Sequence, residues 1–204
     1  MNPKELLIKK IKGINIWLVD GGMIRKELEP DFTNFGHSFR YKFVPKNEFW
    51  IDKSVLKNEL PFFIYRLFLE YDLMGKGMPY EKAYDIAENN ERELRNINQK
   101  NTKDVHIKLI KKYKDIEIWL VDGEVVRDEY DINFTEGGHD LVYDYIPYNE
   151  IWIDNSLIKS EIPVTILHEI YERELMSNGY SYDDAHDEAL KLEQEQRQTS
   201  NSNL

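Results

Sequence analysis

Residues Glu161–Arg197 read EIPVTILHEIYERELMSNGYSYDDAHDEALKLEQEQR. Apolar residues recur at helical spacing through roughly Glu161–Ser177, and Pro163 lies near the start of this segment, where a missing amide hydrogen costs nothing. Gly179 is typical of a helix C-terminus, and Ser181 is placed to cap a second helix whose first turn is acidic. The stretch therefore predicts two helices joined by a short turn, a helical hairpin.

The same pattern occurs earlier in the chain, because the sequence is one unit written twice. A shift of 102 residues aligns Leu7–Arg95 with Leu109–Arg197 without a gap, and 41 of the 89 aligned positions are identical. An internal repeat of this strength indicates a tandem duplication. We expect two domains, 1–98 and 103–199, joined by the polar stretch Asn96–Lys103 and packed as a pseudo-symmetric pair.

Each repeat begins with two local patterns. The basic segments 4–12 and 104–113 are predicted to be short helices. The pairs Asp20-Gly21 and Asp122-Gly123 lie between apolar runs, which is typical of the tight turn of a β-hairpin.

A second hairpin is predicted before the helical hairpin. In the second repeat, residues 141–146 alternate between apolar and polar, Pro147-Tyr148-Asn149 turns, and Glu150–Asp154 returns as a strand. The predicted fold class is α+β: a short helix, two β-hairpins and a C-terminal helical hairpin, present twice.

The composition places the chain among folded proteins. Hydrophobic residues make up 41% and charged residues 32% of its 204 residues, which is enough apolar material for one or two packed domains. No apolar run approaches the length of a membrane span, and the N-terminus lacks the apolar core of a signal peptide, so we expect a cytoplasmic protein without a membrane partner. Because the chain has no cysteine, any metal must be held by histidine and carboxylate groups.

Charge is distributed unevenly along the chain. Residues 1–100 carry 17 Lys+Arg and 15 Asp+Glu, a net charge of +2, whereas residues 101–204 carry 10 and 23, a net charge of −13. An acidic half without a basic stripe repels phosphate, so we expect no nucleic-acid partner.

Three residues of the second helical hairpin have a spacing that suits a metal site. His168 and Glu172 are one turn apart on the same side of the first helix, beside an expected core stripe. That stripe comprises Leu167, Ile170, Tyr171 and Leu175. Glu172 lies seven residues before Gly179 and His186 lies seven after it, so the two are level in an antiparallel hairpin. A cation between the helices could therefore bind His168, Glu172 and His186.

Two imidazoles and one carboxylate form the ligand set of a catalytic zinc site with an open fourth position. Zn²⁺ is therefore the predicted cofactor, with another divalent metal as the alternative. Zinc lowers the pKa of bound water, and Glu169 is placed to remove the proton as general base. Glu193 could orient His186 from outside the ligand set, or be a surface acid. His139 could be an auxiliary ligand or oxyanion stabiliser, but His37 at the same place in the first repeat favours a structural role.

A known family shares part of this pattern. Ile151-Trp152-Ile153-Asp154, a polar loop and then Val164–Glu169 resemble the edge strand and active-site helix of small zincins, the His-Glu-x-x-His metallopeptidases. The resemblance covers about forty residues, Glu150–Glu193. It implies a zincin-like fold whose edge strand pairs with an extended peptide substrate.

Carried over by position, the resemblance makes His168 the first zinc ligand and Glu169 the base. The chain departs from the family at two places. Glu172 stands where the second histidine normally is, and His186 replaces the later glutamate. The ligand types are kept and two of their positions are exchanged.

The first repeat lacks most of these residues. The positions equivalent to His168, Glu169, Glu172 and His186 are occupied by Arg66, Leu67, Glu70 and Tyr84. We therefore expect a degenerate first copy and a metal-binding second copy. The predicted function is a zinc-dependent, peptidase-like hydrolase that acts on a peptide or protein. The alternative is a non-enzymatic acidic protein that binds a protein partner as a decoy or inhibitor, with a structural or inactive site.

Overall fold

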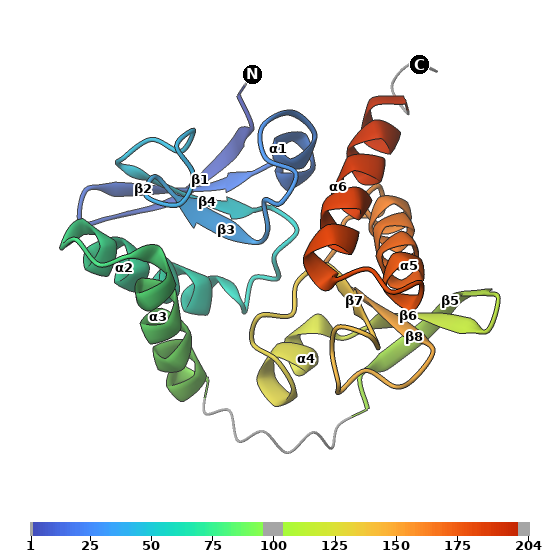
Figure 1. The fold of residues 1–204 in the computed structure, drawn as a ribbon. Helices are drawn as coiled ribbons and strands as arrows, with labels where there is room; N and C mark the ends of the chain where they lie inside the picture. The colour runs from blue at the N-terminus through green and yellow to red at the C-terminus, as the bar shows by residue number, and fades with distance from the viewer. Residues whose placement is uncertain (1, 96–103, 200–204) are drawn as a thin grey trace. The chain divides into compact units, whose positions relative to one another are not determined.

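The computed structural model describes residues 2–95 and 104–199, so the predicted join at Asn96–Lys103 lies outside the described residues. The chain divides into two compact units, Met1–Asn98 and Gln99–Leu204 (Figure 1). Both units are α+β and have the same order of elements. Within the described ranges, no helix is both long and apolar enough to cross a membrane.

The two units consist of equivalent strands and helices. In the first unit they are β1 (Lys4–Ile11), β2 (Ile14–Val19), α1 (Gly21–Glu27), β3 (Phe35–His37), β4 (Glu48–Asp52), α2 (Leu60–Gly75) and α3 (Tyr80–Leu94). In the second they are β5 (His106–Tyr113), β6 (Ile116–Val121), α4 (Gly123–Glu129), β7 (Gly137–His139), β8 (Glu150–Asp154), α5 (Ile162–Ser177) and α6 (Tyr182–Thr199). Each unit holds a four-stranded sheet, in the order β1-β2-β4-β3 or β5-β6-β8-β7.

The basic segments that open each unit are strands, so the prediction of short helices was wrong. β1 pairs antiparallel with β2, and β5 pairs antiparallel with β6. The hairpin turns lie at Lys12-Gly13, where both residues have positive φ, and at Lys114-Asp115, where Lys114 does. Pairing with a neighbouring strand outweighs the helical propensity of these Lys- and Leu-rich segments.

The prediction of hairpin turns at Asp20-Gly21 and Asp122-Gly123 was also wrong. Each aspartate caps a short helix instead. A carboxylate oxygen of Asp20 accepts a hydrogen bond from the Met23 amide at 2.9 Å, and Asp122 accepts one from Val125 at 3.2 Å. Asp20 has φ −77°, outside the positive region that the predicted turn needs.

Of the second predicted hairpin, only the returning strand is present in the structure. Glu150–Asp154 forms β8, but its antiparallel partner is β7 and not residues 141–146, which form turns. β8 also pairs in parallel with β6, so it lies inside the sheet. The zincin resemblance implied that β8 is an edge strand, and this implication was wrong because the edge strands are β5 and β7.

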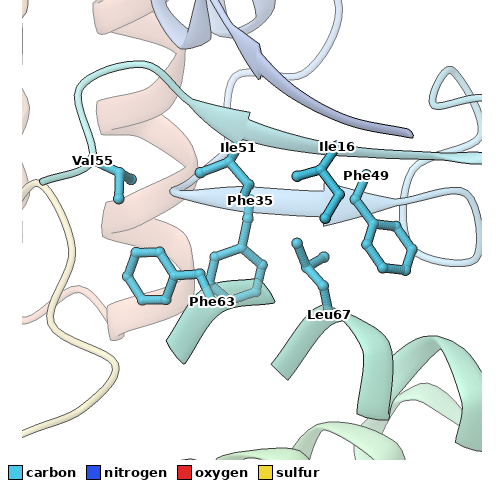
Figure 2. Close-up of a cluster of buried hydrophobic side chains, with 7 residues drawn as sticks. All are labelled: Ile16, Phe35, Phe49, Ile51, Val55, Phe63 and Leu67. Carbon is cyan, nitrogen blue, oxygen red and sulfur yellow. The ribbon is translucent and has the colours of Figure 1, made fainter. Parts of the chain in front are cut away.

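Both faces of each sheet are covered. In the first unit, Phe63 and Leu67 project from α2 onto Ile16, Phe35 and other sheet residues, as Figure 2 shows. A second cluster on the other face joins the sheet to α1 and the following loop; it contains Val19, Ile24, Phe32, Tyr41, Val44 and Trp50. The second unit has two equivalent clusters.

Helices α5 and α6 form the predicted hairpin. Gly179 has φ +94°, which suits glycine after a helix, and the Ser181 hydroxyl accepts a hydrogen bond from the Asp184 amide at 3.2 Å.

The face that α5 buries differs from the expected apolar stripe. Leu167, Tyr171 and Leu175 are half-buried, whereas its fully buried residues include His168, Glu169 and Glu172. Because burying charged groups is costly unless they are paired, this inverted arrangement requires a compensating network inside the unit.

Candidate metal centre

Three side chains from the two helices of the second hairpin converge on one point. Candidate ligand atoms of His168, Glu172 and His186 all lie within 4.8 Å of one another. The Oε2 atom of Glu172 is 3.4 Å from His168 Nε2 and 2.6 Å from His186 Nδ1. The level placement of Glu172 and His186 about Gly179 is therefore present in the structure.

The ring of His168 is fixed by a carboxylate on its far side. His168 Nδ1 lies 3.0 Å from Glu193 Oε2, and a proton on this nitrogen makes it the donor. This contact leaves Nε2 directed at Glu172 and available as a ligand. Histidines that bind metals commonly donate their other ring proton to a carboxylate in this way. Glu193 was considered as a partner of His186, but its contact is with His168.

His139 serves as a donor to Glu172 rather than as a metal ligand. Its Nδ1 accepts a hydrogen bond from the Leu141 amide at 3.2 Å, so the ring proton belongs on Nε2. His139 Nε2 then donates to Glu172 Oε1 at 3.0 Å. His139, Glu169 and Glu172 also lie within 4.8 Å of one another, but Nε2 carries the only proton of the His139 ring as long as Nδ1 accepts from Leu141, so this nitrogen has no free lone pair for a metal. His139 instead orients the carboxylate of Glu172, a role that differs from the auxiliary ligand and the oxyanion stabiliser considered for it.

The network has strong effects on the pKa values of Glu172 and His168. Burial opposes the charge on Glu172, but hydrogen bonds from His139, His168 and His186 outweigh burial and hold its pKa well below the ordinary range. Burial also opposes the charge on His168, but its hydrogen bonds to Glu172 and Glu193 raise its pKa to about 10. Without a metal, His168 is therefore an imidazolium at neutral pH, held between two carboxylates.

Glu169 differs from the other acids because it lacks such partners. Its exposure is 8%, and its carboxyl oxygens, which make no hydrogen bond within the described residues, are not fully shielded from solvent. Burial, together with the negative charges of Glu172 and Glu193, raises its pKa to about 8 despite the opposing effect of His168. An isolated buried carboxyl group is costly for stability, and groups of this kind cluster at functional sites.

The residues around position 169 differ from those around the equivalent position of the first unit. In the first unit, Phe35, Phe63 and Leu67 are buried together in an apolar cluster (Figure 2). The equivalent residues of the second unit are Gly137, Thr165 and Glu169. A Cβ on Gly137 would lie 3.0 Å from Glu169 Oε1, so the glycine lets β7 approach this carboxyl group. Three apolar positions have become small or polar together.

The first unit has a permanent cation in place of the histidines. Arg66 Nε donates to Glu70 Oε1 at 2.9 Å, and its Nη1 donates to Glu91 Oε2 at 3.2 Å. The guanidinium carbon lies 4.4 Å from the centre of the Tyr84 ring. His37 Nε2 is 3.5 Å from Glu70, a longer contact than that of His139 with Glu172.

Two supporting contacts were not predicted from the sequence. Arg197 donates to Glu193 at 2.7 Å and to Glu161 at 2.9 Å, and the equivalent Arg–Glu contacts of Arg95 exist in the first unit. The identity of this arginine in both repeats was the available signal. Arg173 binds Asp140 through two hydrogen bonds, which ties the loop after β7 to α5. This second pair has no equivalent in the first repeat and gave no signal in the sequence.

The donor set fits a zinc ion. Zinc bonds of about 2.0–2.1 Å in a tetrahedral site place ligand atoms about 3.4 Å apart, which matches the contact between His168 and Glu172. The 2.6 Å contact of His186 with Glu172 is a hydrogen bond and would lengthen by less than about 1 Å on metal binding. His186 is the most exposed of the three, with 26% of its side chain accessible.

Comparisons with known proteins leave the zincin resemblance without further support. No protein-family model matches the chain, and neither a search of curated proteins nor a search of solved structures finds a match.

Proposed function

We propose that the second unit binds one Zn²⁺ ion through His168, Glu172 and His186 and uses it to hydrolyse a substrate. The observation that carries this proposal is the arrangement of His168 between Glu193 and Glu172. One ring nitrogen is anchored by a carboxylate, while the other faces a second carboxylate and a second imidazole. The helical hairpin that holds this set has the ligand types and the outer support of a catalytic zinc site.

The chain's own groups divide the chemistry between them. A zinc ion held by two imidazoles and a carboxylate lowers the pKa of water in its open position to near neutrality. Glu169 accepts the proton, because its carboxyl group is close to Glu172 and is not engaged by another donor in the described residues. The positive charge of the ion favours the ionised form of Glu169. His139 keeps Glu172 oriented during this transfer.

The substrate class is proposed from the resemblance and from the accessibility of the site. The zincin resemblance favours a peptide, but strand addition at β7 receives no support, because its three residues are buried. A peptide that enters beside the more exposed His186 is therefore the first substrate class to test.

Three variants test the proposal. His168→Ala and His186→Ala should each lose the bound zinc, and a purified chain that neither contains nor takes up a divalent metal would end the proposal. Glu169→Gln should keep the metal and reduce turnover of a peptide library by at least about 10²-fold, the usual contribution of a general base. Unchanged turnover in Glu169→Gln would assign the base to another residue.

The alternative function is a non-enzymatic acidic protein that binds a protein partner as a decoy or inhibitor. It is favoured by the exposure of Asp183, Asp184 and Asp187 on α6. Under this alternative, replacing all three metal-site residues leaves partner binding intact, and reversing the charges of the three aspartates abolishes it. Loss of partner binding in the triple variant, together with unchanged binding in the charge-reversed variant, would favour the metal-dependent function.

A further inference from the structure

We propose that the guanidinium of Arg66 takes, in the first unit, the place of the metal ion that the second unit is proposed to bind. Histidines at positions 66 and 84 would then complete, with Glu70, the ligand set of the second unit for a divalent transition metal such as Zn²⁺. This inference rests on the proposed function of the second unit. It assigns a role to the first unit, which lacks histidines at positions 66 and 84.

The framework of the second site is present in the first unit. Glu70 and Glu91 occupy the places of Glu172 and Glu193, and both are almost inaccessible, with exposures of 1% and 0%. His37 lies beside Glu70 as His139 lies beside Glu172. Carboxylates so deeply buried need a cation next to them.

Arg66 supplies that cation at the position between the helices. It contacts both Glu70 and Glu91, as His168 contacts both Glu172 and Glu193. Arginine is longer than histidine, so its guanidinium also reaches over the ring of Tyr84. Tyr84 is equivalent to His186, so the charge of Arg66 lies where the second unit directs its ligand atoms.

The charges of the two networks support this assignment. In the first unit, Glu59, Glu70 and Glu91 carry −3, and Arg66 with Arg95 carries +2, which leaves −1. In the second unit, the equivalent carboxylates carry −3 and Arg197 carries +1, which leaves −2 when the histidines are neutral. The second network therefore carries one negative charge more than the first, and a divalent ion would bring it from −2 to 0.

The decisive variant opens the site in the first unit. In the full chain, Arg66→His with Tyr84→His should raise the zinc content from one to two ions per chain, measured by elemental analysis and by native mass spectrometry after Zn²⁺ titration. Tyr84→His alone retains Arg66 and should stay at one ion, which makes it the matched control. A double variant that is folded by circular dichroism and still binds one ion would overturn the inference.

The same substitutions in a chain without the second site distinguish a failure of this inference from a failure of the proposed function. When His168→Ala and His186→Ala are also present, the site opened in the first unit should bind one ion by itself. Wild-type protein without zinc would contradict the proposed function, whereas a missing gain in both backgrounds would contradict only the role of Arg66. The expected ion also supplies the charge that Arg66 provided, so failure of the double variant to fold at saturating Zn²⁺ would count against the inference.

Discussion

The two helical hairpins of this chain show how one scaffold can hold its buried carboxylates in two ways. In the first, Arg66 neutralises Glu70 and Glu91 permanently. In the second, Glu172 and Glu193 face His168, whose charge we propose is exchanged for that of a metal. The carboxylates are the constant part, and the cation is the variable part. The difference separates a permanent ion pair from a proposed site for an exchangeable ligand.

The second difference concerns the residue beside the ion pair. Leu67 is fully buried in an apolar cluster, whereas its equivalent Glu169 is a buried acid with Gly137 against it. A protein selected only for stability gains nothing from this exchange, because a carboxyl group on a residue that is 8% exposed loses most of its hydration. The second unit therefore accepts a less stable interior at the place where chemistry is proposed.

The largest effect is expected from removing the permanent cation. Arg66→Met should destabilise the first unit by about 3–5 kcal/mol, because Glu70 and Glu91 stay buried without their partner. Hydrogen exchange of α2 amides measures the loss within the first unit. Adding Zn²⁺ should not restore the protection, since methionine supplies no suitable ligand; unchanged protection in Arg66→Met would show that the ion pair is not needed.

Exchanging the buried residue beside each site should shift the two units in opposite directions. Glu169→Leu should stabilise the metal-free second unit by about 1–3 kcal/mol, because it removes an isolated carboxyl group from the interior. Leu67→Glu should destabilise the first unit by at least as much. Hydrogen exchange of α5 and α2 amides resolves the two units. Loss of stability in Glu169→Leu would show that Glu169 has a structural partner.

Metal binding to the second unit should depend on pH. His168 is protonated below its pKa of about 10, and the ion competes with the proton on Nε2. Apparent Zn²⁺ affinity should therefore increase about tenfold per pH unit, equivalent to about 1.4 kcal/mol, between about pH 7 and 9. Isothermal titration in buffers of different ionisation enthalpy measures the released proton. An affinity that does not change with pH would exclude displacement of this proton.

A smaller pH effect is expected far from the metal site. Burial opposes the charge on His106, but its hydrogen bonds to Glu150 and Asp104 outweigh burial and raise its pKa above 6.5. The stabilisation is therefore complete below pH 6.5 and is lost as pH rises through the folded-state pKa. We expect a loss of about 0.5 kcal/mol, typical of a partly exposed pair.

The first unit provides the control for this prediction, since Lys4 binds Glu48 at the same place. His106→Lys should remove the loss, because lysine stays charged to about pH 10. Stability is followed by urea unfolding of the second unit between pH 6 and 9. A decline of equal size in His106→Lys would assign the effect to another group.

The repeat, the helical hairpin and the strand at Glu150–Asp154 could be predicted from the sequence, because each depends on strong local patterns. The N-terminal strands could not, since a Lys- and Leu-rich segment suits a helix until its neighbour pairs with it. The Asp-Gly pairs led to a wrong prediction of hairpin turns, because an aspartate carboxylate can also cap a helix. For the candidate site, spacing about Gly179 predicted that the three candidate ligands lie near one another. The roles of His139 and Glu193 needed the structure, because they depend on which ring nitrogen each group contacts.

Metal content of each unit tests the central comparison most directly. The wild-type chain, saturated with Zn²⁺ and freed of excess ion, should contain one zinc by native mass spectrometry. His168→Ala with His186→Ala should contain none, whereas Arg66→Ala with Tyr84→Ala should keep one if the chain remains folded. A wild-type chain without zinc, or a zinc content that the histidine substitutions leave unchanged, would contradict the account.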